Sequence, residues 1–382
     1  MDDLVYELDP KGDIFLILDN VSTDFPYNLR DITTVAGWPD GLRNPPAPTS
    51  DRNKTIKQED DGSSGDAVDS AKTPKSPPQR RLQIRASSKH LTLACPQFQR
   101  TLQNGFQEGT ELRATGCLRF PVRDWEAVPF LVLMLIIHHR TRLVPWQVSL
   151  DRLVEIAQLV DYYECHEAVE PFSNSWLIHL KIRSLSPPYY TPSSDDEARK
   201  WISVSWVFNE AKAFQESSKY LESKSTSMIS FSGLPVPGTI QDEINRSRRA
   251  LMTKVVECMH SLSSQLRDGP ERCSELCDCA LLGVLTKGMH RAGILSLNSF
   301  SSFEGISFTQ LAHECRNIKT PSNMRHICRN PLSPCSISKQ VEPLLQNIEK
   351  LNVGLKKLQF VKDPFLLNWN TRLIKSTVKL PS

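Results

Sequence analysis

Segments with strand and helix periodicity alternate between residues 82 and 180, and they constrain the fold more than any other part of the chain. The clearest helix has apolar residues at the i, i+3, i+4, i+7 spacing that places side chains on one helix face, namely Leu150, Leu153, Val154, Ala157 and Val160. Ile156 and Leu159 widen this stripe, which indicates a helix buried on most sides. The alternation predicts a mixed α/β domain.

Two short apolar segments predict strands, and a long polar segment separates them. Asp13–Leu18 is an almost continuous apolar run after a Pro-Lys-Gly turn, which suits a buried strand, and Leu82–Ile84 alternates. Residues 44–81 contain no aromatic residue and are rich in Pro, Ser, Asp, Lys and Gly. Such a segment cannot bury enough apolar surface to offset the entropy of ordering, so we predict that it is disordered. If the two strands pair, it is a hairpin insertion, whose closure entropy grows only slowly with length.

Local signals predict how the next helices begin and end. Ser87 or Ser88 can cap a short helix, in which Leu91 and Leu93 are expected to face inward. Gly105 and Gly109 predict a loop. Asp124 is expected to cap the helix that contains the apolar run at residues 128–137. This run has ten residues, about half the length of a bilayer span, so it predicts a core helix.

The second half of the chain predicts helices and no convincing strand after a Pro/Ser-rich break at residues 182–194. One expected helix face consists of Ile240, Ile244, Leu251, Val255 and Leu262. The last helix has apolar residues on heptad a/d positions, namely Val341, Leu344, Ile348, Leu351, Leu355 and Leu358. This pattern suits either a coiled-coil seam or an amphipathic helix on its own core, and Pro343 and Gly354 favour the second interpretation.

Length and charge narrow the class of protein. A chain of 382 residues predicts two or three domains. The formal net charge of +3 is mild and argues against a nucleic-acid partner. The acidic N-terminus has no signal-peptide pattern, so we expect an intracellular protein, cytoplasmic or nuclear, with no membrane partner. In that compartment the ten cysteines are expected to be reduced.

The strongest metal-binding pattern is Cys273-x3-Cys277-x-Cys279. Zinc takes four thiolate or imidazole ligands, often as pairs two to four residues apart. Cys277 and Cys279 would point to different sides of a helix, and no second close pair follows among the downstream candidates His313, Cys315, His326, Cys328 and Cys335. Cysteine is also a common core residue. We therefore predict no metal site and no cofactor, and leave open whether Cys273, Cys277 and Cys279 bind an ion.

Catalytic patterns are weak. Cys165 and His166 are adjacent on an expected helix and cannot face each other as nucleophile and base. His138 and His139 suggest a helix end with a cation near the negative end of the dipole. The sequence contains no glycine-rich phosphate loop, serine elbow or HExxH motif, so we predict no catalytic residue and no enzyme.

The polar insertion carries three candidate modification sites. Ile56-Lys57-Gln58-Glu59 fits the pattern for conjugation of a small ubiquitin-like modifier. Thr73-Pro74 and Ser76-Pro77 fit proline-directed phosphorylation, which would add about −2 charge per phosphate. Whether Lys57, Thr73 and Ser76 are modified stays open.

Residues 82–180 resemble a BTB/POZ domain, and Asp13–Leu18 resembles the first strand of that family. The resemblance rests on the step Leu91, Cys95-Pro96, Phe98, on Ile136-Ile137-His138, and on the helix over residues 153–170. The amino-acid sequence of these segments is most similar to that of fungal BTB-domain proteins with a helical C-terminal extension. Ser87-Ser88 departs from the His-Lys pair that the family often has there.

The resemblance implies a BTB/POZ domain followed by a mostly α-helical domain. The expected layout is a strand region, a disordered insertion, the BTB/POZ core, a helical domain and an unassigned tail, over residues 1–43, 44–81, 82–181, 182–360 and 361–382. It further implies a non-enzymatic scaffold or adaptor that binds protein partners and forms a homodimer. The alternatives are a substrate adaptor with a cullin partner and a zinc-stabilised nuclear regulator.

Overall fold

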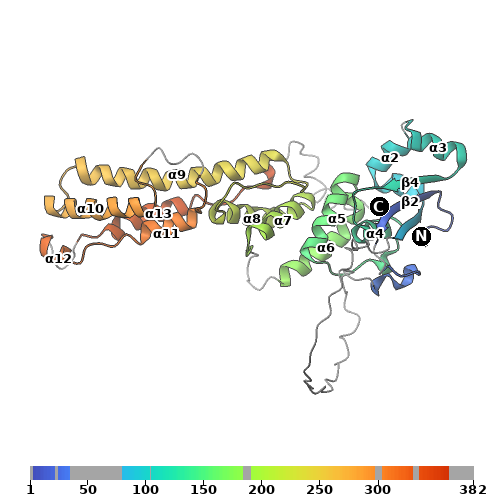
Figure 1. Cartoon of the computed structure of the whole chain (residues 1–382), viewed down its shortest axis with the longest axis horizontal. Coiled ribbons are helices and arrows are strands. Elements are labelled where there is room, and N and C mark those ends of the chain that lie inside the picture. The colour runs from blue at the N-terminus through green and yellow to red at the C-terminus, as the bar shows by residue number, and fades with distance from the viewer. Residues whose placement is uncertain are drawn as a thin grey trace, which may run out of the picture. The chain divides into compact units, whose positions relative to one another are not determined.

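The computed structural model describes residues 3–21, 25–34, 80–103, 105–183, 191–296, 303–329 and 335–360. The chain divides into two compact units, residues 1–180 and 181–382, which Figure 1 labels by element. The described residues are mixed α/β and mostly helical. None of the helices in these ranges combines the length and the hydropathy that a bilayer span requires.

The N-terminal unit contains a four-stranded sheet in the order β1-β3-β2-β4. Its strands are β1 (Asp3–Glu7), β2 (Ile14–Val21), β3 (Arg80–Ala86) and β4 (Leu118–Val122). The two predicted strands pair antiparallel as β2 and β3, with Leu16 opposite Ile84. β2 and β3 are the two central strands, and each has a neighbouring strand on either side.

The insertion between β2 and β3 was predicted over residues 44–81. β3 begins at Arg80, so the predicted end is two residues too late. Arg80 and Arg81 are polar, yet they pair with Val21 and with Asp3 of the neighbouring strands. Residues 44–79 lie outside the described residues, and so do the candidate modification sites Lys57, Thr73 and Ser76.

Strand β1 was not predicted. It runs parallel to β3 and alternates between exposed and buried residues, with Leu4 and Tyr6 facing the core. Tyr6 donates a hydrogen bond from Oη to the carbonyl oxygen of Pro26 at 2.5 Å. The acidic residues Asp3 and Glu7 occupy the exposed positions, so the alternation was present but short.

Helices complete the N-terminal unit: α1 (Ser88–Ala94), α2 (Pro96–Gln103), α3 (Gln107–Thr115), α4 (Ala127–Ile137), α5 (Leu150–Tyr163) and α6 (His166–Arg183), with the 3-10 turns η1 (Leu29–Thr34) and η2 (Thr141–Leu143). Every residue from Val128 to Ile137 is buried, so the apolar run is the central core helix. α4 packs against α5, whose buried residues include Leu153, Ala157 and Val160.

Two of the predicted local signals are wrong, and a third is right in position only. Ser87 is the N-cap residue of α1, but its side chain makes no capping bond, and Asp13 instead accepts from the Ser88 N–H at 2.7 Å. Leu93 is 87% exposed, because it lies on the outer face of this short helix. Asp124 has a left-handed φ of 66°, and Glu126 occupies the N-cap position of α4.

Gly109 was predicted in a loop but lies in α3. A Cβ atom at Gly109 would lie 2.2 Å from the carbonyl oxygen of Leu102 in α2. The glycine therefore marks a close approach of the α3 backbone to α2, which is a packing requirement and not a turn.

The C-terminal unit is helical in its described residues. Its elements are α7 (Asp195–Val207), α8 (Ala211–Lys224), α9 (Gly238–Asp268), α10 (Glu275–Arg291), α11 (Phe308–Arg316), α12 (Met324–Ile327), α13 (Ile337–Glu349) and the turn η4 (Lys357–Gln359). The 31-residue helix α9 contributes buried residues to two hydrophobic cores. Ile240 and Ile244 pack with α7 and α8, and residues 251–266 pack with α10, α11 and α13.

The heptad pattern at the end of the chain belongs to a core helix. Val341, Leu345 and Ile348 of α13 are buried in the cluster that includes α9 and α11. α13 ends at Glu349, so Leu351 and Leu358 lie beyond it and are exposed. Val341, Leu345 and Ile348 follow an i, i+4, i+7 spacing on one helix face, so Leu345 and not Leu344 is the fully buried residue between the other two.

Candidate functional site

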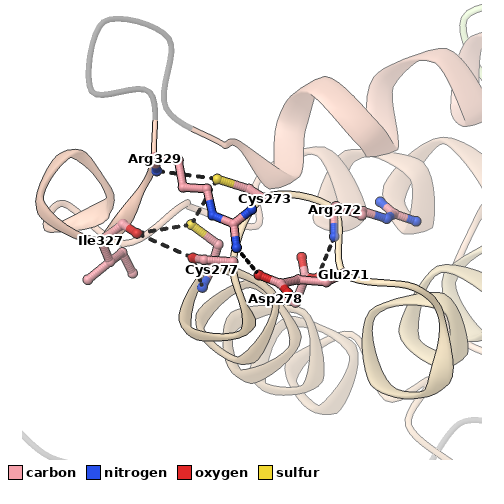
Figure 2. A network of polar contacts seen from close by, with 8 residues as sticks. Glu271, Arg272, Cys273, Cys277, Asp278, Ile327 and Arg329 are labelled. Atoms are coloured by element: carbon pink, nitrogen blue, oxygen red, sulfur yellow. Dashed lines mark hydrogen bonds and ion pairs between the residues drawn. The ribbon is translucent and has the colours of Figure 1, made fainter.

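Four cysteines of the C-terminal unit bring their sulfur atoms together. The Sγ atoms of Cys273, Cys277, Cys328 and Cys335 all lie within 4.8 Å of one another. Cys273 precedes α10, Cys277 lies in its first turn, Cys328 follows α12, and Cys335 precedes α13. Figure 2 shows Cys273 and Cys277 at the start of α10, facing the segment that contains Ile327 and Arg329. We call these four residues the cysteine cluster.

The start of α10 positions the first pair. The Ser274 side chain accepts a hydrogen bond from the Cys277 N–H at 3.2 Å and so caps the helix. The Asp278 side chain accepts from the Arg272 N–H at 3.1 Å, which holds the chain just before the helix (Figure 2). These two bonds fix the backbone on both sides of Cys273, so its sulfur and that of Cys277 lie 3.7 Å apart.

The second pair is held by contacts with the first. The sulfur of Cys277 lies 3.3 Å from that of Cys328 and 3.5 Å from the carbonyl oxygen of Ile327. The backbone N–H of Arg329 donates to the Cys273 sulfur at 3.4 Å, as Figure 2 shows. The N–H of Cys335 donates to the Cys328 sulfur at 3.1 Å. All four thiols are free.

The thiols of the cysteine cluster differ in the direction of their pKa shifts. The backbone N–H of Arg329 lowers the pKa of Cys273 below its ordinary value. Burial raises the pKa of Cys277, and it raises that of Cys335 to about 12. Four thiolates this close would repel one another, so a fully ionised cluster requires a cation among the sulfurs.

The structure shows which of the candidate metal ligands from the sequence lie close together and which do not. Cys273 and Cys277 come together as their spacing suggested, whereas Cys279 is exposed on α10. Cys315 is buried in the core face of α11, where burial raises its pKa to about 12. The Nε2 atom of His313 lies 2.8 Å from Nδ2 of Asn317, the C-cap residue of the same helix. The side chain of His326 lies outside the described residues.

Cys328 and Cys335 were candidate ligands in the sequence, but they were not predicted to form a ligand pair. Six residues separate them, more than the spacing usual for a zinc-binding pair. The prediction of no metal site rested on the lack of a second close pair, and tertiary structure supplies that pair. The signal available in the sequence was the density of cysteines, since seven of the ten lie between residues 258 and 335.

The two other candidate sites are core features. Cys165 is buried, and its pKa lies well above the ordinary value because of a hydrogen bond with Cys95 and burial. A thiol of this kind is a poor nucleophile. His138 ends α4 as expected, but burial lowers its pKa to about 4, so it is neutral at pH 7. The prediction that it provides a cation for the helix dipole is wrong.

Among its described residues, the N-terminal unit has a strand edge without a paired strand and several exposed apolar side chains. β1 pairs with β3 on one side, and no other described strand pairs with its outer edge. Val5 of this strand is 46% exposed. Further large apolar side chains of this unit that are exposed are Tyr27, Leu93, Phe106, Trp146, Tyr162 and Ile178.

Comparisons with protein-family models, curated proteins and solved structures found no match for this chain.

Proposed function

We propose that this protein is a non-enzymatic adaptor or scaffold whose N-terminal unit is a BTB/POZ-type domain that forms a homodimer. The helical unit then holds a client or positions the N-terminal unit. Support comes first from the order of the elements, and then from the surface of β1.

The order of elements follows the one that the resemblance implies. An antiparallel pair, β2 and β3, leads into the short helices α1 and α2, and then into β4, α4, α5 and α6. The residues that carry the resemblance lie in the helices of this order. Leu91 and Phe98 are buried in α1 and α2, and the Ile136-Ile137-His138 step ends α4.

The observation that carries the proposal is the outer edge of β1. A strand with one unpaired edge can receive a strand from another chain, because its outward N–H and C=O groups are free to pair. Val5 would become buried in such a contact. A specific dimer buries about 1,600 Å² in total, which requires more than a five-residue strand. Exposed apolar side chains such as Leu93 and Trp146 offer additional area.

The test is the mass of the full-length protein in solution, measured by light scattering coupled to size-exclusion chromatography. We expect a dimer for the wild type and a shift to monomer for Val5→Lys, since a charge at the strand edge opposes pairing. Val353→Lys is the matched control, because Val353 is exposed in the other unit, and it should stay dimeric. A monomeric wild type contradicts the proposed dimer, and a Val5→Lys variant that stays dimeric contradicts the proposed contact at the edge of β1.

Recruitment of a cullin is a narrower form of the same function. Co-purification of a cullin with the full-length protein, with loss of the cullin in the monomeric variant, would support that form. Purification without a cullin would leave the scaffold role and remove the ligase role.

A further inference from the structure

We propose that Cys273, Cys277, Cys328 and Cys335 bind one Zn²⁺ ion as a structural site in the helical unit. This inference is independent of the proposed dimer, since it concerns the C-terminal unit alone.

The spacing of the sulfurs fits a single tetrahedral ion. Zinc–sulfur bonds of about 2.3 Å place the four sulfurs of a tetrahedral site about 3.8 Å from one another. In the cysteine cluster, Cys277 lies 3.7 Å from Cys273 and 3.3 Å from Cys328, and no pair exceeds 4.8 Å. These separations lie on both sides of the tetrahedral value, so small side-chain rotations would form the site.

The donor set selects the metal. Four thiolates in a tetrahedron favour zinc over Mg²⁺ or Ca²⁺, which take oxygen ligands. An iron–sulfur cluster places several iron and sulfide atoms between its thiolates, and its cysteine sulfurs must lie farther apart than those that share one ion. Sulfurs that all lie within 4.8 Å are too close to enclose such a cluster.

The site has the features of a structural ion. Four protein ligands fill the coordination shell and leave no position for a substrate or a reactive water. Cys277 and Cys328 are buried. The N–H groups of Arg329 and Cys335 donate to ligand sulfurs, and such outer hydrogen bonds orient thiolates and reduce their charge. Zinc binding would release the protons of the four thiols to solvent as the thiolates form.

The ion would join parts of the unit that are distant in the sequence. Cys277 and Cys328 are 51 residues apart, so zinc would tie the start of α10 to α12 and to the start of α13. α12 has only four residues and cannot hold its place by helix propensity. We expect the metal to supply the constraint that a short helix lacks.

The decisive measurement is the metal content of full-length protein purified under reducing conditions without chelator. Elemental analysis by mass spectrometry should find one zinc ion per chain. Cys273→Ser and Cys335→Ser should each lose most of that zinc, whereas Cys279→Ser should retain it. Cys279 is the matched control, because it lies two residues from Cys277 on the same helix and is exposed.

A second readout uses the wild type alone, since ligand variants can fail to fold. Removal of zinc by a strong chelator should lower the midpoint of thermal unfolding, and added Zn²⁺ should restore it. Co²⁺ added to the metal-free protein should give the visible bands of tetrahedral cobalt with sulfur-to-metal charge transfer. Both results support the site.

Other outcomes overturn the proposal. These are a wild type without zinc whose four thiols react freely, disulfides between the cluster cysteines in reduced preparations, iron in place of zinc, or retention of zinc in the Cys273→Ser and Cys335→Ser variants. A cobalt spectrum typical of octahedral oxygen ligands would also exclude a four-cysteine site.

Discussion

The Nε2 atom of His138 accepts a hydrogen bond from the backbone N–H of Ser87 at 3.0 Å, across 51 residues of sequence. Its Nδ1 atom lies 2.9 Å from the carbonyl oxygen of Met134, one turn earlier in α4. Nε2 accepts and Nδ1 donates, so the ring is neutral with its proton on Nδ1. His138 thus joins the end of α4 to the junction of β3 and α1. Its ring is the acceptor for the backbone N–H of Ser87.

Protonation of His138 should destabilise the protein in mild acid. Burial lowers the pKa from 6.5 to about 4 in the folded state, so the unfolded state binds the proton more readily. Stability is therefore full above pH 6.5 and falls as the pH drops toward 4. The difference corresponds to about 3 kcal/mol. Urea unfolding between pH 7 and pH 4.5 should show a weaker pH dependence for His138→Gln, which should also be less stable at pH 7. Parallel pH profiles for the two proteins would exclude this role.

Substitution of Arg248 should strongly destabilise the helical unit. Its guanidinium is fully buried and donates to the carbonyl oxygens of Ser225, Phe303 and Ile306 at 3.0, 2.7 and 3.0 Å. Arg248→Met removes all three donors, and an unsatisfied buried carbonyl costs about 1–3 kcal/mol. We expect a loss of about 3 kcal/mol or more in the free energy of unfolding.

Arg249→Met is the matched control for this prediction, because Arg249 is adjacent on α9 and exposed. It should change the free energy of unfolding by no more than about 0.5 kcal/mol. Equal effects of the two substitutions in chemical denaturation would show that the three carbonyls find other partners.

Two glycine substitutions in helices should have opposite effects. Gly109→Ala places a Cβ atom 2.2 Å from the Leu102 carbonyl oxygen, so α2 and α3 must move apart. Overpacking of this kind costs about 1–3 kcal/mol. Gly283→Ala in α10 meets nothing within 4 Å and should stabilise by about 0.5–1 kcal/mol, because alanine is the better helix former. The two midpoints of thermal unfolding should therefore shift in opposite directions, and shifts of the same sign would contradict the close approach at Gly109.

Substitutions near the end of the chain distinguish a core helix from a coiled-coil seam. Leu345 is 1% exposed, and Leu345→Ala should cost about 2–5 kcal/mol in the free energy of unfolding. Leu351 is 52% exposed, and Leu351→Ala should change that free energy by about 0.5 kcal/mol or less. A seam on the heptad positions requires the reverse order, together with a change in oligomeric mass for Leu351→Ala.

Much of the fold follows from patterns within single segments. The stripe on α5, the ten apolar residues of α4 and the β2–β3 pair were all predicted, because burial on one face or on all sides leaves a local period in the sequence. β1 was missed since five residues with two acidic ends give too short a signal. Ser87 occupies the predicted N-cap position, but Asp13, distant in the sequence, makes the bond to the start of α1; the N-cap residue of α4 is Glu126, two residues after the predicted cap.

The sequence by itself determined the helical periods of α4 and α5 and the strands β2 and β3, and it presented Cys273 and Cys277 as a pair. Tertiary structure alone decided that Cys328 and Cys335 join them, that Cys279 does not, and that His138 is neutral. The physical reason is distance along the chain. Periodicity and ligand spacing report contacts within a turn or two, whereas the partners of Cys277 and His138 lie 51 residues away and meet only when the whole unit packs.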